Sequence, residues 1–69
     1  MTAHVRRRFP YWKVQWRDTR SATWRDVQRA HYDRDDATVA AHTHAIAFRV
    51  DVRLMRVDRT ARTPEEVDL

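Results

Sequence analysis

Arginine is the side chain through which this sequence could do the most chemistry. The chain has 69 residues, and 13 of its 14 basic residues are arginines, three of them consecutive at residues 6–8. A guanidinium offers a planar fork of donors to phosphate, to guanine or to a carboxylate. The excess of arginine over lysine has a second explanation in the composition of the chain. Arg, Ala, Asp and Val dominate while Lys, Ile and Asn are scarce, as in proteins of GC-rich genomes.

The histidines and carboxylates form no recognisable catalytic or metal-binding pattern. His42 and His44 are two residues apart, and on a helix such side chains point about 200° apart, so they cannot share a metal ion. Cysteine and glycine are both absent, which excludes thiolate chemistry, disulfides and glycine-rich phosphate loops. No Ser-His-Asp order suggests a nucleophilic triad. We therefore expect no enzymatic activity, no metal site and no cofactor.

Charge is distributed unevenly along the chain, whose formal net charge is +4. Residues 1–9 carry three arginines and no acid, and we expect them to form a flexible basic arm. Residues 60–69 contain three acids after Pro64 and are expected to be an acidic-ended tail, which leaves residues 10–59 as the folded domain. The positive balance favours a nucleic acid or an acidic protein as the partner.

Two runs before residue 30 are predicted to be strands. Residues 11–17 alternate strictly, which puts Trp12 and Trp16 on one face, with Val14 between them, and polar side chains on the other. Residues 23–28 are expected to form the return strand of a hairpin. Trp24 and Val27 are three apart there, so a bulge is needed if both are to face the core.

A helix and a third strand follow. Asp33 or Asp35 is a suitable N-cap for a helix over about residues 36–47, and its apolar face is expected to contain Val39, Thr43 and Ile46. Residues 48–54 alternate again, with Phe48, Val50, Val52 and Leu54 inward and Arg49, Asp51 and Arg53 outward. The expected core residues are Trp12, Trp16, Ile46, Val50 and Val52.

The expected fold is a single small α+β domain of the order β-β-α-β. A hairpin followed by a helical crossover places the third strand beside the first, giving a three-stranded antiparallel sheet of order 2-1-3 with one helix packed on one face. The third strand would then be a long edge strand, and such edges invite pairing with another chain. We therefore expect a homodimer.

No run approaches the roughly 20 apolar residues of a membrane-spanning helix. The basic run at residues 6–8 is also not followed by the apolar stretch of a secretory signal. We expect a cytoplasmic protein with no membrane partner.

The first hairpin resembles a known DNA-binding domain. Its residues Tyr11, Val14, Trp16, Arg17 and Asp18, followed by Trp24, Arg25 and Asp26, are similar to the arm-type DNA-binding domain of phage tyrosine integrases. That resemblance implies a three-stranded sheet that reads DNA, although here the helix precedes the third strand and turn glycines are lacking. A shorter part of the same pattern resembles chromodomain-like barrels, which bind peptides. The whole chain also resembles small accessory proteins of phages and mobile elements from GC-rich bacteria.

The leading hypothesis is a small non-enzymatic module that binds nucleic acid through a basic sheet face and the N-terminal arm. The alternative is a protein-binding regulator or inhibitor, for example one encoded by a phage, that uses the same face or a strand edge, and a third option is a structural subunit of a homo-oligomer. A continuous basic stripe would favour nucleic acid, whereas an exposed apolar patch would favour a protein partner. The candidate nucleic-acid-binding residues are Arg6, Arg7, Arg8, Lys13, Gln15, Arg17, Arg25, Arg49 and Arg53.

Overall fold

The structure is a computed structural model that describes residues 8–60 and 63–69. The expected basic arm therefore lies almost entirely outside the described residues. None of the described residues belongs to a helix long and apolar enough to cross a membrane. The elements, in chain order, are β1 (Tyr11–Arg17), β2 (Arg25–Asp26), α1 (Arg34–Phe48), β3 (Asp51–Val57) and β4 (Glu65–Val67).

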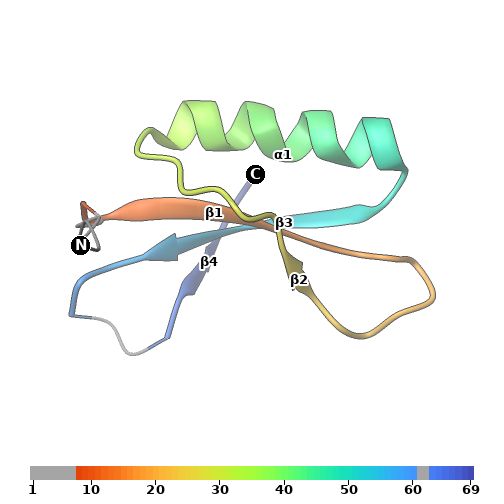
Figure 1. Ribbon diagram of the computed structural model, residues 1–69, viewed down its shortest axis with the longest axis horizontal. Helices are drawn as coiled ribbons and strands as arrows, with labels where there is room; N and C mark the ends of the chain where they lie inside the picture. Colours follow the sequence, from red (N-terminus) through yellow and green to blue (C-terminus); the bar gives the residue numbers. More distant parts are fainter. Residues whose placement is uncertain (1–7, 61–62) are drawn as a thin grey trace, which may run out of the picture.

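One helix covers one face of an antiparallel sheet whose strand order is β2-β1-β3-β4 (Figure 1). The predicted α+β class and the pairing of the strand after the helix with the first strand are confirmed. The sheet has four strands, however, because residues expected in the acidic tail pair with β3. Val67 lies opposite Leu54 and packs against the core, so an apolar contact holds this acidic segment on the sheet. The prediction that the third strand is an edge is therefore wrong.

The register of β1 against β3 determines which side chains face the helix. Val14 lies opposite Leu54, and Trp16 lies opposite Val52. Because partners in an antiparallel pair point to the same side of the sheet, the Trp-bearing face of β1 is the face that α1 covers, as predicted. Val14 and Leu54 are fully buried, and Trp12 and Val52 pack against them while half-buried.

The helix begins two residues before the predicted start, and its ends have clear physical causes. The carboxylate of Asp33 accepts a hydrogen bond of 2.8 Å from the amide of Asp35, which is the expected N-cap interaction. At the other end Arg49 adopts a left-handed conformation with φ of 52°, and the chain reverses there. Residues 48–50 are therefore not part of a strand, and Phe48, predicted to be in the core, is 65% exposed.

The face of the helix that packs on the sheet is not the predicted one. Ala37 and Ala41 are completely buried against Val14 and Leu54, whereas Ile46 is 79% exposed. Two indole side chains of β1 point at the helix and fill the space beneath it, so the helix approaches with its smallest residues. The prediction that Val39, Thr43 and Ile46 form the core face is wrong, because all three point to solvent.

Candidate functional site

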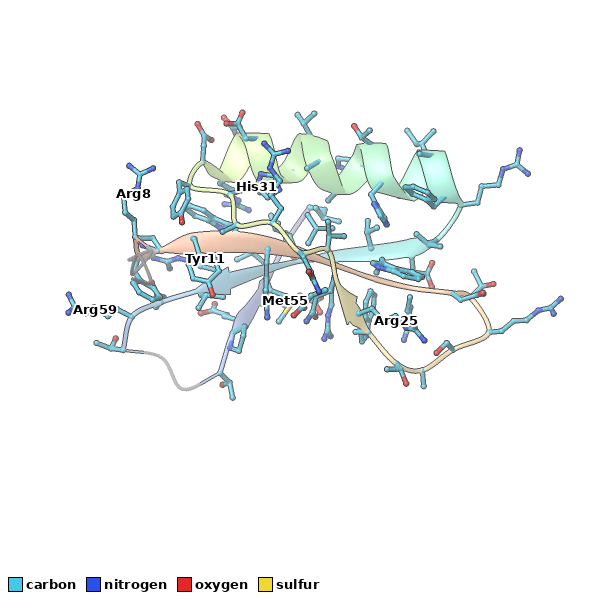
Figure 2. All side chains as sticks on the ribbon, in the orientation of Figure 1. Arg8, Tyr11, Arg25, His31, Met55 and Arg59 are labelled. Carbon is cyan, nitrogen blue, oxygen red and sulfur yellow. The ribbon has the colours of Figure 1, made fainter. Side chains whose placement is uncertain are left out.

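The side of the sheet away from the helix, which we call the open sheet face, contains four of the predicted binding residues. Register places Lys13, Gln15 and Arg17 of β1 beside Arg53 of β3 on this side. Figure 2 shows Met55 on the same side, below the β1–β3 pair. The further members that the following paragraphs use are Trp24, Asp26, Asp51 and Glu66.

Each cation of the open sheet face lies beside a carboxylate. The nitrogen-to-oxygen distances are 3.4 Å for Lys13–Asp26, 3.5 Å for Arg17–Asp51 and 3.7 Å for Arg53–Glu66. These three cations and three anions cancel, so the face is formally neutral. The expectation of a strongly basic sheet face is therefore not met. The pairs are partly exposed, and ion pairs of this kind contribute little to stability individually. Their effect on function is larger, because a phosphate would have to compete with a carboxylate for each cation.

A chain of polar contacts crosses all four strands on this face. Gln15 of β1 donates through Nε2 to a carboxylate oxygen of Asp26 on β2, at 2.7 Å. Its Oε1 accepts from Nε of Arg53 on β3, also at 2.7 Å, and Arg53 in turn pairs with Glu66 on β4. The hydrogen bond from Gln15 lowers the pKa of Asp26 below its usual value of 3.8, and the charge of Lys13 lowers it further while burial opposes the shift. We call these contacts the cross-sheet network.

Trp24 lies on the open sheet face rather than in the core. Asp26 pairs with Gln15 and therefore points away from the helix, so Trp24, two residues earlier, points the same way. The guanidinium carbons of Arg17 and Arg53 lie 4.5 Å and 4.4 Å from the centre of its indole ring. The expected bulge is absent from this pair of residues, and simple alternation turns only Val27 toward the core. The arginines thus interact with an aromatic ring as well as with acids.

The other predicted binding residues do not join this surface. Arg25 lies opposite Trp16 on the helix side of the sheet, 5.8 Å from its ring centre. Arg49 ends the helix, and Arg8 lies over the ring of Tyr32. In Figure 2, Arg8 and Arg59 lie at one end of the molecule and Arg25 lies toward the other. Arg6 and Arg7 fall outside the described residues.

Charge balance extends beyond the sheet face. Residues 8–60 and 63–69 contain eleven basic and ten acidic side chains, a net charge of only +1. The remaining excess of the chain's +4 comes from Arg6, Arg7 and Arg62, which are outside those ranges. The described part of the molecule therefore has little excess positive charge with which to attract a polyanion.

A second surface, which sequence reasoning assigned to the core, is the side of α1 that points away from the sheet. We call it the outer helix face. Val39 is 65% exposed and Ile46 is 79% exposed, and the two are seven residues apart, so they lie on one side of the helix two turns from each other. The face consists of the exposed residues Asp35, Asp36, Val39, His42, Thr43 and Ile46.

One feature of the sequence could have revealed which side of α1 faces the sheet. Ala37 and Ala41 are four residues apart, which makes a narrow strip of small side chains along one side of the helix. Trp12 and Trp16 on the opposing strand are two of the three largest side chains in the chain and leave room only for such a strip. Hydrophobicity alone selected Val39 and Ile46 instead, because it takes no account of volume.

A hollow of about 380 Å³ lies beside the start of β1, where the chain between Asp26 and His31 runs along that strand. Its lining is mixed in charge and contains Lys13, Asp26 and Arg29. Burial lowers the pKa of His31 below its usual value of 6.5, and the neighbouring charge of Arg29 lowers it further, whereas Asp36 opposes the shift. Within the part of the chain that the structure describes, no three His, Asp or Glu side chains are placed to hold a metal ion.

Comparison with known proteins adds no assignment. No protein-family model matches the chain, and no curated protein or solved structure is significantly similar to it. The resemblance of the first hairpin to the integrase domains therefore stays a prediction. Any functional conclusion has to be drawn from the two surfaces themselves.

Proposed function

We propose that this protein is a non-enzymatic protein-binding module whose contact surface is the outer helix face. The observation that supports the proposal is the exposure of Val39 and Ile46 on a helix that has no charged residue between positions 37 and 48. In the whole chain, 35% of the residues are charged, so this uncharged surface contrasts with the rest of the molecule.

A solvated helix face is normally covered with charged and polar side chains, and isolated apolar residues on it need no explanation. Here the two apolar side chains of the face are both β-branched aliphatics two turns apart, and the residues between them are uncharged. The centre of a protein interface is depleted of charge in the same way. Covering both side chains would remove roughly 200 Å² of apolar surface from water, worth about 5 kcal/mol before the losses of association.

The competing proposal, nucleic-acid binding, has less support from the described residues. The open sheet face is neutral, because each of its cations is paired with an acid. Binding to phosphates would have to begin by breaking those pairs, or would depend on Arg6 and Arg7. We expect weak binding to duplex DNA, single strands and RNA at about 150 mM salt, since a surface of this charge neutralises few phosphates.

The experiment that tests the proposal compares two variants of the full chain. The double variant V39Q/I46Q makes the outer helix face polar, and W24A alters the open sheet face while leaving the helix unchanged. Proteins captured on each form are quantified, and any partner that depends on one face is purified and titrated by calorimetry. We expect binding to be lost with V39Q/I46Q and retained with W24A.

Two results would contradict the proposal. One is a partner whose affinity is unchanged in V39Q/I46Q. The other is nucleic-acid binding at micromolar protein and about 150 mM salt, with a steep dependence on salt that R53A reduces; this would favour the sheet face as a phosphate-binding surface.

A further inference from the structure

We infer that the outer helix face binds a second copy of this chain, with the two α1 helices packed antiparallel about a two-fold axis. This inference rests on the proposed function and names its partner. A two-fold interface requires a surface that is complementary to itself when one copy is rotated by half a turn. The outer helix face and the ends of α1 meet this requirement in the placement of their apolar and charged residues.

The complementarity follows from the positions of the residues along the helix. If the axis passes midway between His42 and Thr43, Val39 of one copy lies opposite Ile46 of the second copy, and the reverse holds by symmetry. His42 and Thr43 then lie beside the axis, each next to its own copy. The same rotation brings Asp35, in the first turn of the helix, close to Arg49, the residue that ends it, because 14 residues of helix place the two on the same flank. One placement of the axis therefore satisfies the apolar and the charged positions together.

Charge selects the antiparallel arrangement. Asp35 and Asp36 lie in the first turn of α1, and Arg49 follows its last turn, with no charged residue between positions 37 and 48. A parallel pair would bring the acids of both copies together and align the helix dipoles. An antiparallel pair places each acidic end beside the basic end of the other helix, where the opposed dipoles are also favourable.

The distances are compatible with contact at both ends. Asp35 and Arg49 lie about 7.5 and 6.5 residues from the axis, or roughly 10–11 Å at 1.5 Å per residue. Helices that cross near 20° diverge by only about 3–4 Å at that distance. An arginine side chain is long enough to close such a gap, and both residues are exposed.

The area of contact indicates a weak dimer. A 15-residue helix is about 22 Å long, and pairing along one side hides on the order of 400 Å² per copy. This is below the roughly 800 Å² per partner of a stable complex, so we expect a dissociation constant of tens to hundreds of micromolar. The edge strands of the sheet offer less contact area for pairing, because β2 has two residues and β4 has three. The earlier expectation of a dimer through the edge of the third strand is therefore replaced by one through the helix.

The test uses two charge-reversed variants, Asp35→Arg and Arg49→Asp. In an antiparallel homodimer of the first variant, two arginines would face each other at each end of the interface, and in one of the second variant, two aspartates would. In a parallel dimer the original chain already has like charges at both ends, so neither substitution would weaken self-association and the mixture would bind more tightly than the original.

That comparison gives a clear expectation for the antiparallel pair. In the 1:1 mixture, position 35 of the Asp35→Arg chain faces position 49 of the Arg49→Asp chain, so an arginine meets an aspartate. At the other end, the unchanged Arg49 of the first chain faces the unchanged Asp35 of the second. Sedimentation equilibrium from 10 μM to 1 mM should show self-association weakened about tenfold or more in each variant alone, and recovery to within about threefold of the original in the mixture.

Two controls make the experiment decisive. Arg20→Asp changes the net charge as much as Arg49→Asp does, in an exposed turn that is not part of the helix, and should leave self-association unchanged. Ile46→Gln removes apolar contact at an exposed position and should weaken self-association without unfolding the protein, as circular dichroism would show.

The possible outcomes separate this inference from the proposed function. An 8.4 kDa monomer at 1 mM would overturn the dimer, and a different partner that V39Q/I46Q fails to bind would leave the proposed function standing. Self-association that Ile46→Gln does not weaken, or that the mixture does not restore, would overturn the antiparallel helix arrangement. Self-association that is lost in each variant and recovered in the mixture supports the antiparallel arrangement, because misfolded variants would not recover on mixing.

Discussion

Replacing Gln15 with methionine tests whether the cross-sheet network stabilises the fold. Methionine has nearly the same length and shape but makes neither of the two hydrogen bonds of 2.7 Å that join Asp26 and Arg53 through this side chain. Hydrogen bonds to charged groups contribute about 1.5–3 kcal/mol when buried, but water reaches this face and replaces part of each contact. We expect a loss of about 1–2 kcal/mol, which lowers the melting temperature of a domain of this size by roughly 4–15 °C.

The same substitution should change the titration of Asp26, because Gln15 makes the largest contribution to its lowered pKa. A carboxyl whose pKa is lowered on folding contributes stability that is present above its usual value of 3.8 and is lost as the pH falls through the folded value. The difference in the free energy of unfolding between the original protein and Q15M should therefore shrink below about pH 3.8. It should not vanish, because Gln15 of the original protein still accepts the hydrogen bond from Arg53.

Urea denaturation at pH 7 and pH 2.5, with NMR titration of the Asp26 carboxyl, measures both effects. Gln28→Met is the matched control, because Gln28 is exposed and makes no side-chain hydrogen bond in the described residues. If Q15M is as stable as Q28M at pH 7 and Asp26 titrates as before, the network does not stabilise the fold and the reasoning is refuted.

Three further predictions concern the core and its pH dependence. Leu54→Ala should cost about 2–5 kcal/mol and Ile46→Ala close to zero in urea denaturation at low micromolar protein, since one side chain is fully buried and the other is 79% exposed; equal losses would mean that the helix is rotated. Ala41→Leu should destabilise the protein by about 1–3 kcal/mol through overpacking, and an unchanged midpoint would place Ala41 outside the core. His31 has a lowered pKa when folded, so the unfolded chain binds the proton more readily and stability falls as the pH drops below about 6.5; His31→Gln should remove that loss between pH 7 and 5, and an unchanged pH profile would contradict the assignment.

Several features of the fold were predictable because they depend on local order along the chain. Strict alternation in residues 11–17 indicates a strand and identifies Trp12 and Trp16 as its inner side, since successive side chains of a strand point to opposite faces. The run of acids before an alanine-rich segment predicts a capped helix, because a free amide needs an acceptor there, and Asp33 supplies it.

Features that depend on distant segments could not be predicted in the same way. The residues of β4 have no strong pattern of their own, and they form a strand only because β3 offers them a free edge and a place for Val67. The inner side of the helix likewise depends on the volume of the side chains it meets, so the two tryptophans opposite favour Ala41 there over Ile46.

The candidate site shows the same division between sequence and tertiary structure. Composition and alternation alone determined that the chain lacks thiols and glycine loops, that it is rich in arginine and that Lys13, Gln15 and Arg17 share one side of a strand. Only the pairing of strands decided that the face is neutral, because Asp26, on another strand, is brought within 3.4 Å of Lys13 by the register of the sheet. Side-chain alternation depends on neighbours in the chain, whereas net charge and exposure of a surface depend on which strands and helices come together to form it.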